Sequence, residues 1–272
     1  MLADGCCQSV ISLRACCKRA SDTCGHRQNR DEDLIFSDNG TGRPYLLLHG
    51  GAGPQSMSGL ATVLQKSNRS IVPIHPGFAG KPRPDGFDRI SDLALVYLAL
   101  LERLELQEVV IVGNSVDGWI AAEMALRHSP RIAGIVLLNA YGIDTGSLTR
   151  HIVDPMKLAP AERAALAFHD PVRYAIAPTM PEALAQMAEN QRTLRIYAGE
   201  PFMHAPSLHA RLSRMPVPSL VIWGESDGIV DIAYRQRFAA AMPAARFNTV
   251  PQAGHFPHIE QLDIVVGLIE DF

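Results

Sequence analysis

The stretch LELQEVVIVGNSVDGWIAAEMALRH, residues 104–128, constrains the fold of this chain more than any other part of it. Its β-branched run at 109–112 is typical of a strand buried on both faces. The turn GNSVDG follows, and from Trp119 the apolar residues recur at helical spacing. Ser115 lies on this turn, where the dipole of the next helix favours negative charge. The stretch therefore predicts a nucleophile elbow on a buried strand.

Strand and helix patterns alternate on both sides of this stretch. Apolar runs that predict strands are at 45–48, 70–75, 132–139, 219–223 and 246–250. Helical patterns are at 57–66, 90–104, 233–241 and 260–270. Such alternation predicts an α/β fold with a mostly parallel sheet flanked by helices.

The alternation stops between about 142 and 211, where the chain is rich in Ala, Pro, Met and His. Three short helices are predicted there, at 161–168, 181–197 and 207–212. We expect this stretch to be a helical insertion between two strands of the sheet.

Residues 1–32 differ from the rest of the chain. All five cysteines lie there, and a polar stretch without periodicity follows them. Adjacent cysteines do not match the C-x₂₋₄-C spacing that brings two sulfurs to one zinc ion, so no metal is expected. We predict that 1–32 is a poorly ordered extension and that the folded domain spans 33–272, with its first strand at 33–38. The cysteines are Cys6, Cys7, Cys16, Cys17 and Cys24.

Charge and hydropathy exclude several classes of partner. The formal net charge is −3, which favours neither nucleic acid nor an anionic membrane surface. No apolar run approaches the roughly 20 residues of a membrane span. The predicted domain has no cysteine and the N-terminus lacks the pattern of a secretory signal, so a cytoplasmic location is expected. The sequence favours no particular oligomeric state.

Four motifs, in this order and spacing, resemble those of the α/β-hydrolase superfamily. They are HGGAG at 49–53, GNSVDGW at 113–119, GESDGIV at 224–230 and AGHFPHIE at 253–260. The resemblance covers about 33–272 and implies one α/β-hydrolase domain whose insertion forms a helical cap over the active site. It also implies a serine hydrolase that uses no cofactor and no metal.

The resemblance assigns three residues to a catalytic triad. Ser115 is the nucleophile, Asp227 the acid and His255 the base, in the chain order of the family. A serine hydroxyl needs such a base because it is a poor nucleophile until its proton is removed. Asp227 and His255 each follow a predicted strand, and open α/β sheets place their sites at the carboxyl ends of strands.

Alternatives to two of these assignments are open at this point. Asp144 follows the predicted strand at 132–139, the one before the strand that leads to Asp227, and is the second candidate for the acid. Asp227 would then serve as the N-cap of a helix before Ile229. His258 is the nearest rival of His255, although its position predicts the start of a helix.

Two main-chain N–H groups are expected to form an oxyanion hole. One belongs to Val116, directly after the nucleophile. The other is assigned to Gly51 in HGGAG, with Ala52 as the alternative. His49 is expected to bond to the backbone of this loop rather than to transfer a proton.

Asp117 departs from the family pattern, which has a small residue, usually glycine, at this point of the tight turn. A carboxylate about 6 Å from the developing oxyanion would oppose its charge by roughly 3 kcal/mol at an effective dielectric near 20. That corresponds to about two decades in rate, partly offset because the same charge favours histidinium. We therefore predict that Asp117→Gly raises turnover. Asp117 is not expected to be the nucleophile, since Trp119 would then occupy a position that must be small.

The first hypothesis for function is a hydrolase that cleaves a small ester or related carbonyl compound through an acyl-enzyme. Family members with this triad also cleave C–C bonds, lactones or N-terminal proline peptides, so the fold does not fix the substrate. The second hypothesis is a ligand-binding protein that keeps the fold but hydrolyses little, with Asp117 as its main support.

The substrate is expected to be a small molecule with an apolar acyl part. Its pocket would be lined by apolar residues of the cap, which the sequence equally allows to form the core of the cap. These residues are Met156, Phe168, Met180, Met187, Phe202 and Met203.

Overall fold

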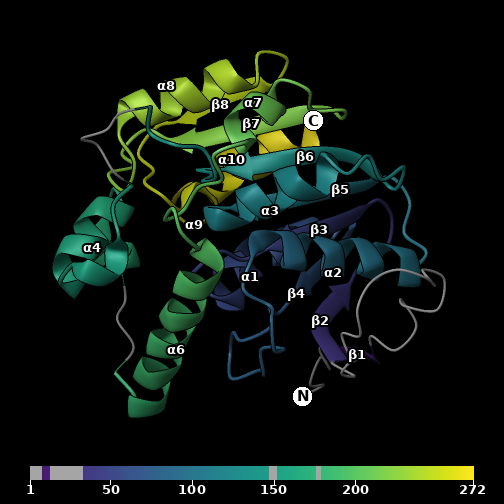
Figure 1. Cartoon of the computed structure of the whole chain (residues 1–272), viewed down its shortest axis with the longest axis horizontal. Helices are drawn as coiled ribbons and strands as arrows, with labels where there is room; N and C mark the ends of the chain where they lie inside the picture. Colours follow the sequence, from purple (N-terminus) through teal and green to yellow (C-terminus); the bar gives the residue numbers. More distant parts are fainter. Residues whose placement is uncertain (1–7, 13–32, 147–151, 176–178) are drawn as a thin grey trace.

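The computed structural model of this chain describes residues 8–12, 33–146, 152–175 and 179–272. They form an eight-stranded sheet with the strand order β1-β2-β4-β3-β5-β6-β7-β8 (Figure 1). The strands from β4 to β8 in this order are parallel, whereas β2 is antiparallel to β4 and β1 to β2. The predicted mostly parallel sheet is confirmed. The strands are β1 (Gln8–Ser12), β2 (Asp33–Asn39), β3 (Pro44–Leu48), β4 (Arg69–Pro73), β5 (Val109–Asn114), β6 (Ile132–Leu138), β7 (Ser219–Gly224) and β8 (Arg246–Val250).

Helices cover both faces of the sheet, and alternate residues of each central strand pack under different helices. On β5, Val109 and Ile111 join the cluster on one face, whereas Val110 and Val112 join the cluster on the other. The first face is covered by α2 (Ile90–Arg103), α3 (Val116–Ala125) and α8 (Ile232–Ala241). The second is covered by α1 (Ser58–Leu64) and α10 (Leu262–Glu270). Because both faces are apolar, the strands read as continuous hydrophobic runs.

The segment between β6 and β7 contains the predicted helical insertion. Its described elements are η3 (Pro155–Lys157), α4 (Pro160–Ala167), α5 (Pro171–Tyr174), α6 (Pro181–Ala198) and α7 (Leu208–Leu212). The three helices expected here match α4, α6 and α7 within two residues at each end. α6 begins with a proline in its first turn and ends at Gly199, whose φ of 67° stops the helix. Figure 1 shows α4 and α6 projecting away from the sheet.

The N-terminal segment contributes a strand that sequence patterns did not indicate. Gln8–Ser12 forms β1 and pairs with β2 at the edge of the sheet. All five cysteines lie outside the described residues. The division of the chain at residue 32 stays a prediction. Among the described helices, none combines the length and the apolar character needed to span a bilayer.

Candidate active site

The turn between β5 and α3 has the geometry of a nucleophile elbow. Ser115 has φ 62° and ψ −126°, a backbone conformation that residues other than glycine rarely adopt. A Cβ atom at Gly113 would lie 2.2 Å from the main-chain oxygen of Asp117. One at Gly118 would lie 2.3 Å from Cβ of Ala140. The turn therefore requires glycine at 113 and 118, whereas position 117 accommodates a side chain.

The predicted acid and base meet beside this turn. Nδ1 of His255 lies 3.0 Å from Oδ2 of Asp227, and both side chains are buried. Oδ1 of Asp227 also accepts a hydrogen bond from the Ile229 N–H at 3.0 Å. This bond caps no helix, because α8 begins at Ile232 and is capped by Asp231, whose side chain accepts the Tyr234 N–H. Ser115 is 8% exposed, and no hydrogen bond joins its Oγ to His255 among the described residues. Such catalytic contacts often close only when substrate binds.

The two rival residues are placed elsewhere. Asp144 pairs with Arg237 at 2.9 Å and accepts a hydrogen bond from the Gly146 N–H. His258 lies in α9 (Pro257–Glu260), where its imidazole is buried. Burial, and then the nearby His255, lower the pKa of His258 to about 3, so this ring is neutral at physiological pH. Neither rival contacts the Asp227–His255 pair by a hydrogen bond.

Two asparagines that the sequence analysis did not single out, together with Glu260 of the AGHFPHIE motif, hold this pair in place. Asn139 donates Nδ2 to Oδ2 of Asp227 at 2.7 Å and accepts the Gly224 N–H at 3.1 Å. Asn114 donates Nδ2 to the main-chain oxygen of His255 at 3.0 Å. Glu260 accepts the N–H of Gly254, next to His255, at 2.6 Å. Their only sequence signal is position: each asparagine follows an apolar strand, and Glu260 lies in the AGHFPHIE motif.

Tyr141 stacks on the imidazole of His255, with ring centroids 5.3 Å apart. Phe168 and Phe256 stack on each other next to His255, with centroids 5.2 Å apart. Of the apolar cap residues expected in a substrate pocket, Phe168 is the one that this contact brings to the site. Met180 is 63% exposed, which does not fit a pocket-lining role.

The HGGAG loop passes directly beside Ser115. It leaves β3, the parallel neighbour of β5, and a Cβ atom at Gly50 would lie 3.5 Å from Cβ of Ser115. The position fits an oxyanion loop whose N–H groups face the elbow. Gly51 also lies under α6, since a Cβ atom there would be 2.5 Å from Cδ2 of Leu194.

α6 is bound to the loop that follows β4 by polar side chains on one of its faces. Oγ1 of Thr193 donates to the Gly77 oxygen at 2.9 Å. Oδ1 of Asn190 accepts the Ala79 N–H at 2.9 Å, and the hydroxyl of Tyr197 donates to the Pro76 oxygen at 3.2 Å. With Leu194 on Gly51, these contacts place α6 over the HGGAG loop.

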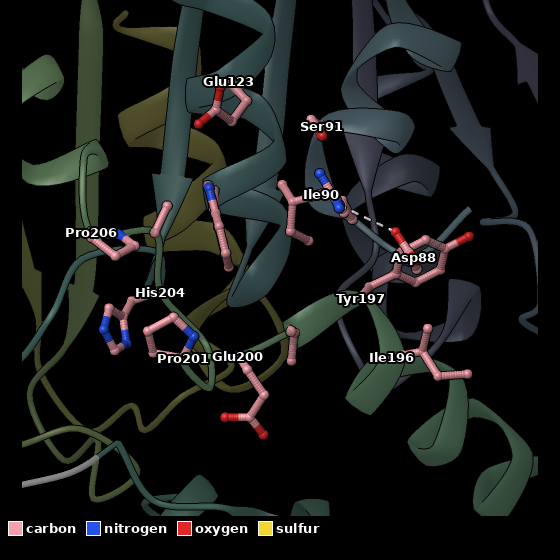
Figure 2. Close-up of a pocket in the computed structure, with 15 residues that line it drawn as sticks. Asp88, Ile90, Ser91, Glu123, Ile196, Tyr197, Glu200, Pro201, His204 and Pro206 are labelled. Carbon is pink, nitrogen blue, oxygen red and sulfur yellow. Dashed lines mark ion pairs between the residues drawn. The ribbon is translucent and has the colours of Figure 1, made fainter. Parts of the chain in front are cut away.

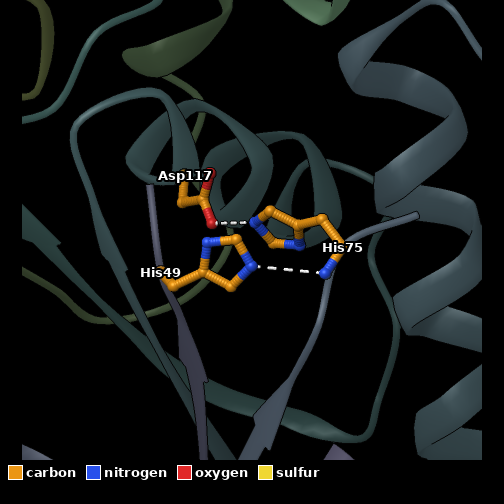
Figure 3. A group of neighbouring side chains, drawn as sticks. All are labelled: His49, His75 and Asp117. Carbon is orange, nitrogen blue, oxygen red and sulfur yellow. Dashed lines mark hydrogen bonds and ion pairs between the residues drawn. The ribbon is translucent and has the colours of Figure 1, made fainter. Parts of the chain in front are cut away.

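Asp117 does not face the elbow as the sequence analysis assumed. Its side chain is fully buried, and its Oδ2 forms a short ion pair with Nε2 of His75 (Figure 3). His75 follows β4, and its Nδ1 is hydrogen-bonded to the hydroxyl of Tyr97 on α2. The ring of His49 packs on that of His75 with centroids 3.8 Å apart. The carboxylate therefore has a local partner for its charge.

The charges in this cluster are set by burial and by its histidines. Burial raises the pKa of Asp117, but His75, His49 and the Gly50 N–H outweigh it and lower the pKa below the usual value. Burial and His75 lower the pKa of His49 to about 3, so His49 is neutral. As expected, His49 bonds to the backbone. Its Nδ1 lies 2.8 Å from the main-chain oxygen of Gly50, and its Nε2 lies 3.2 Å from the main-chain nitrogen of His75.

His49, His75 and Asp117 could by composition hold a metal ion, since their ligand atoms lie within 4.8 Å of one another. Their hydrogen bonds argue against this use. Both ring nitrogens of His49 bond to main-chain groups, and both of His75 bond to side chains. An ion would have to displace these contacts from a fully buried site.

A cavity of about 580 Å³ lies away from the elbow (Figure 2). It is bordered by the start of α2, by Trp119 and Glu123 of α3, by the last turn of α6 and by residues of the segment that follows α6. Neither Ser115 nor His255 lines it, so it is not the site at which the triad would act.

Comparison with known proteins agrees with this geometry. Residues 45–268 match the Alpha/beta hydrolase family, and the chain belongs to that family. It is 28% identical to a 2-hydroxymuconate semialdehyde hydrolase of Pseudomonas sp. strain CF600, over 86% of this chain and 88% of the relative. It is 29% identical to a pimeloyl-[acyl-carrier protein] methyl ester esterase of Aromatoleum aromaticum, over 84% of this chain and 98% of the relative.

The fold is also found among solved structures. A bromoperoxidase from Bacillus anthracis superposes with a TM-score of 0.74, at 19% identity, over 97% of this chain and 100% of the other. The chain is thus an α/β hydrolase whose relatives act on small molecules.

Proposed function

We propose that this protein is a cofactor-independent serine hydrolase that cleaves a small ester through an acyl-enzyme. Ser115 attacks the carbonyl carbon, and Nε2 of His255 takes the hydroxyl proton and returns it to the leaving alcohol. Asp227 holds the imidazole through Nδ1, and the N–H groups of Gly51 and Val116 stabilise the oxyanion. Water then hydrolyses the acyl-enzyme with His255 as the base.

The observation that carries this proposal is the buried Asp227–His255 pair beside a serine in a strained turn. Strained backbone persists where the surroundings impose it, and such positions cluster at functional sites. The partners of the pair, Asn114 and Asn139, orient it from two neighbouring strands. A ligand-binding protein would have no use for this arrangement. The main support for that hypothesis, an unpaired carboxylate at Asp117, is removed by its contact with His75.

The experiment is labelling of the purified protein with a fluorophosphonate probe, together with hydrolysis of a short p-nitrophenyl ester. Ser115→Ala is the control, with its fold checked by circular dichroism. We expect labelling and hydrolysis in the wild type and neither in the variant. Unlabelled, folded wild-type protein would refute the serine mechanism, and hydrolysis that survives in Ser115→Ala would place the activity elsewhere.

A second candidate within the same mechanism is hydrolysis of a C–C bond next to a carbonyl group. The similarity to the 2-hydroxymuconate semialdehyde hydrolase supports it, whereas the similarity to the methyl ester esterase supports the ester. We favour the ester because the stacked Phe168 and Phe256 give the site an apolar wall for an acyl chain. Comparing kcat/KM for a series of methyl esters and for a 2-hydroxymuconate semialdehyde separates the two. A higher kcat/KM for the semialdehyde would reverse our choice.

A further inference from the structure

The buried residues Asp117, His75 and His49 lie behind the elbow and take no part in the proton transfers proposed above. They come from three different elements: the first turn of α3, the loop after β4 and the end of β3. We call them the relay cluster (Figure 3). Tyr97 closes the cluster on its far side by a hydrogen bond to His75.

The relay cluster forms an unbroken path between two segments of backbone. At one end, Asp117 directly follows Val116, and its Oδ2 is bonded to Nε2 of His75. The main-chain N–H of His75 donates to Nε2 of His49 at 3.2 Å. At the other end, Nδ1 of His49 lies 2.8 Å from the oxygen of Gly50, the residue before Gly51. The two ends are therefore adjacent in the chain to Val116 and Gly51, the two proposed donors of the oxyanion hole.

The hydrogen bonds allow only one tautomer of His49. Its Nε2 accepts the N–H of His75, so the proton must be on Nδ1, which donates to the Gly50 oxygen. Burial, and then His75, lower the pKa of His49 to about 3, so this tautomer persists at physiological pH. The peptide group between Gly50 and Gly51 is thereby fixed, and it carries the N–H of Gly51. The same oxygen accepts the N–H of Gly53 at 3.2 Å, and Gly50 itself, with φ 58°, has no side chain that could add a further contact.

We propose that Asp117, acting through His75 and His49, positions the N–H of Gly51 toward the oxyanion. The inference rests on the proposed serine mechanism and gives the unusual aspartate a role in it. Asp117 is a positioning residue because it does not touch the reacting atoms. An acidic residue at this place would then raise activity, contrary to the prediction from sequence that Asp117→Gly raises turnover.

The test is Asp117→Asn, which keeps the size of the side chain and removes its charge. The readouts are kcat and KM for an ester and the inhibition constant of a trifluoromethyl ketone, whose adduct with the serine carries an oxyanion. We expect kcat to fall about 10- to 100-fold with little change in KM. A misplaced oxyanion donor weakens the binding of the transition state but not the binding of the substrate. The inhibition constant should rise by the same factor as kcat falls.

A second variant is Asp117→Gly, which carries the residue that the family usually has here and so is expected to fold. It should show the same loss. Unchanged or increased kcat in either folded variant would overturn the inference, and so would a fall in kcat without a matching rise in the inhibition constant.

The matched control is Glu123→Gln, on the same helix. Glu123 is a buried acid that pairs with Arg211 and, at 2.8 Å, with Arg127, and it lies away from the oxyanion loop. Its loss should lower the melting temperature without changing the inhibition constant. If Glu123→Gln changed kcat and the inhibition constant as much as Asp117→Asn does, Asp117 would act only through stability. That result would overturn the positioning role. Failure of the serine mechanism is distinct, since Ser115→Ala would then match the wild type.

Discussion

Nδ2 of Asn114, the residue before the proposed nucleophile, lies 3.0 Å from the main-chain oxygen of His255, the proposed base. The same amide group donates to the oxygen of Leu138, at the end of β6, at 3.1 Å. One buried side chain thus connects the elbow with the neighbouring strand and with the histidine loop. The distance between nucleophile and base depends on a group that takes no part in the chemistry.

We predict that Asn114→Ala lowers kcat/KM about tenfold or more, because a small misplacement of a base slows proton transfer. The loss of two buried hydrogen bonds should also lower the free energy of unfolding by about 1–3 kcal/mol. Ester hydrolysis and urea unfolding measure the two effects. Asn68→Ala is the control, since the side chain of Asn68 donates to the hydroxyl of the neighbouring Ser67 at an exposed position, and the variant keeps the main-chain bonds. Wild-type kinetics in Asn114→Ala would show that the histidine loop is held by other contacts.

Asp227→Asn should reduce kcat by about two to four decades. The amide removes the charge that stabilises histidinium and favours the wrong tautomer of His255. Asp144→Asn is the matched control because Asp144 pairs with Arg237 rather than with His255. We expect that variant to keep kcat within about twofold of the wild type, since rearrangements at exposed ion pairs cost little. The reverse pattern would make Asp144 the acid of the triad.

The sheet and the Asp–His pair could be predicted because their signals are local. The run at 109–112 is apolar enough to indicate a buried strand by itself, and the turn after it has a recognisable motif. Asp227 and His255 were assigned by the resemblance of their motifs to the family, and the strands that they follow lie side by side, which brings them near each other. The helices of the insertion were predicted for the same reason.

The surroundings of Asp117 could not be predicted in this way. His49 and His75 are far from Asp117 in the sequence, and only the strand order β4-β3-β5 brings the three together. The glycine of the family pattern suggested that position 117 was sterically closed. The close contacts are instead at Gly113 and Gly118, and the Asp117 side chain leaves the turn in another direction. Asn114 and Asn139 were missed because an asparagine at the end of a strand is common in any turn.

Stability should fall as pH decreases below about 6.5, the ordinary pKa of histidine. Burial lowers the pKa of His49 and of His258 to about 3 in the folded protein. Between these values the unfolded chain binds more protons, so each histidine reduces the free energy of unfolding by about 1.4 kcal/mol per pH unit. The pKa of Asp117 is lowered in the folded protein, so its carboxylate also contributes to the free energy of unfolding. This contribution is lost only at still lower pH, below the pKa of an aspartate in the unfolded chain.

Urea unfolding at several pH values between about 7 and 5 measures this dependence. His258→Gln should reduce the slope by about 1.4 kcal/mol per pH unit, because glutamine does not titrate. Wild-type protein, unfolded over the same pH range, is the control. An unaltered slope in His258→Gln would mean that the buried ring is already protonated in the folded state.

Thr193→Val should increase the rate at which a fluorophosphonate labels Ser115. Ser115 is 8% exposed and Leu194 of α6 lies against Gly51 of the neighbouring loop, so we expect a bulky probe to reach the serine after α6 moves. Valine has the shape of threonine but cannot donate to the Gly77 oxygen, which is one of the contacts that hold α6 down. If that bond contributes about 1 kcal/mol, the open state and the labelling rate rise about fivefold. Arg192→Gln removes an ion pair on the exposed side of the same helix and should not change the rate. Equal rates in all three proteins would show that the probe enters by a route that does not require α6 to move.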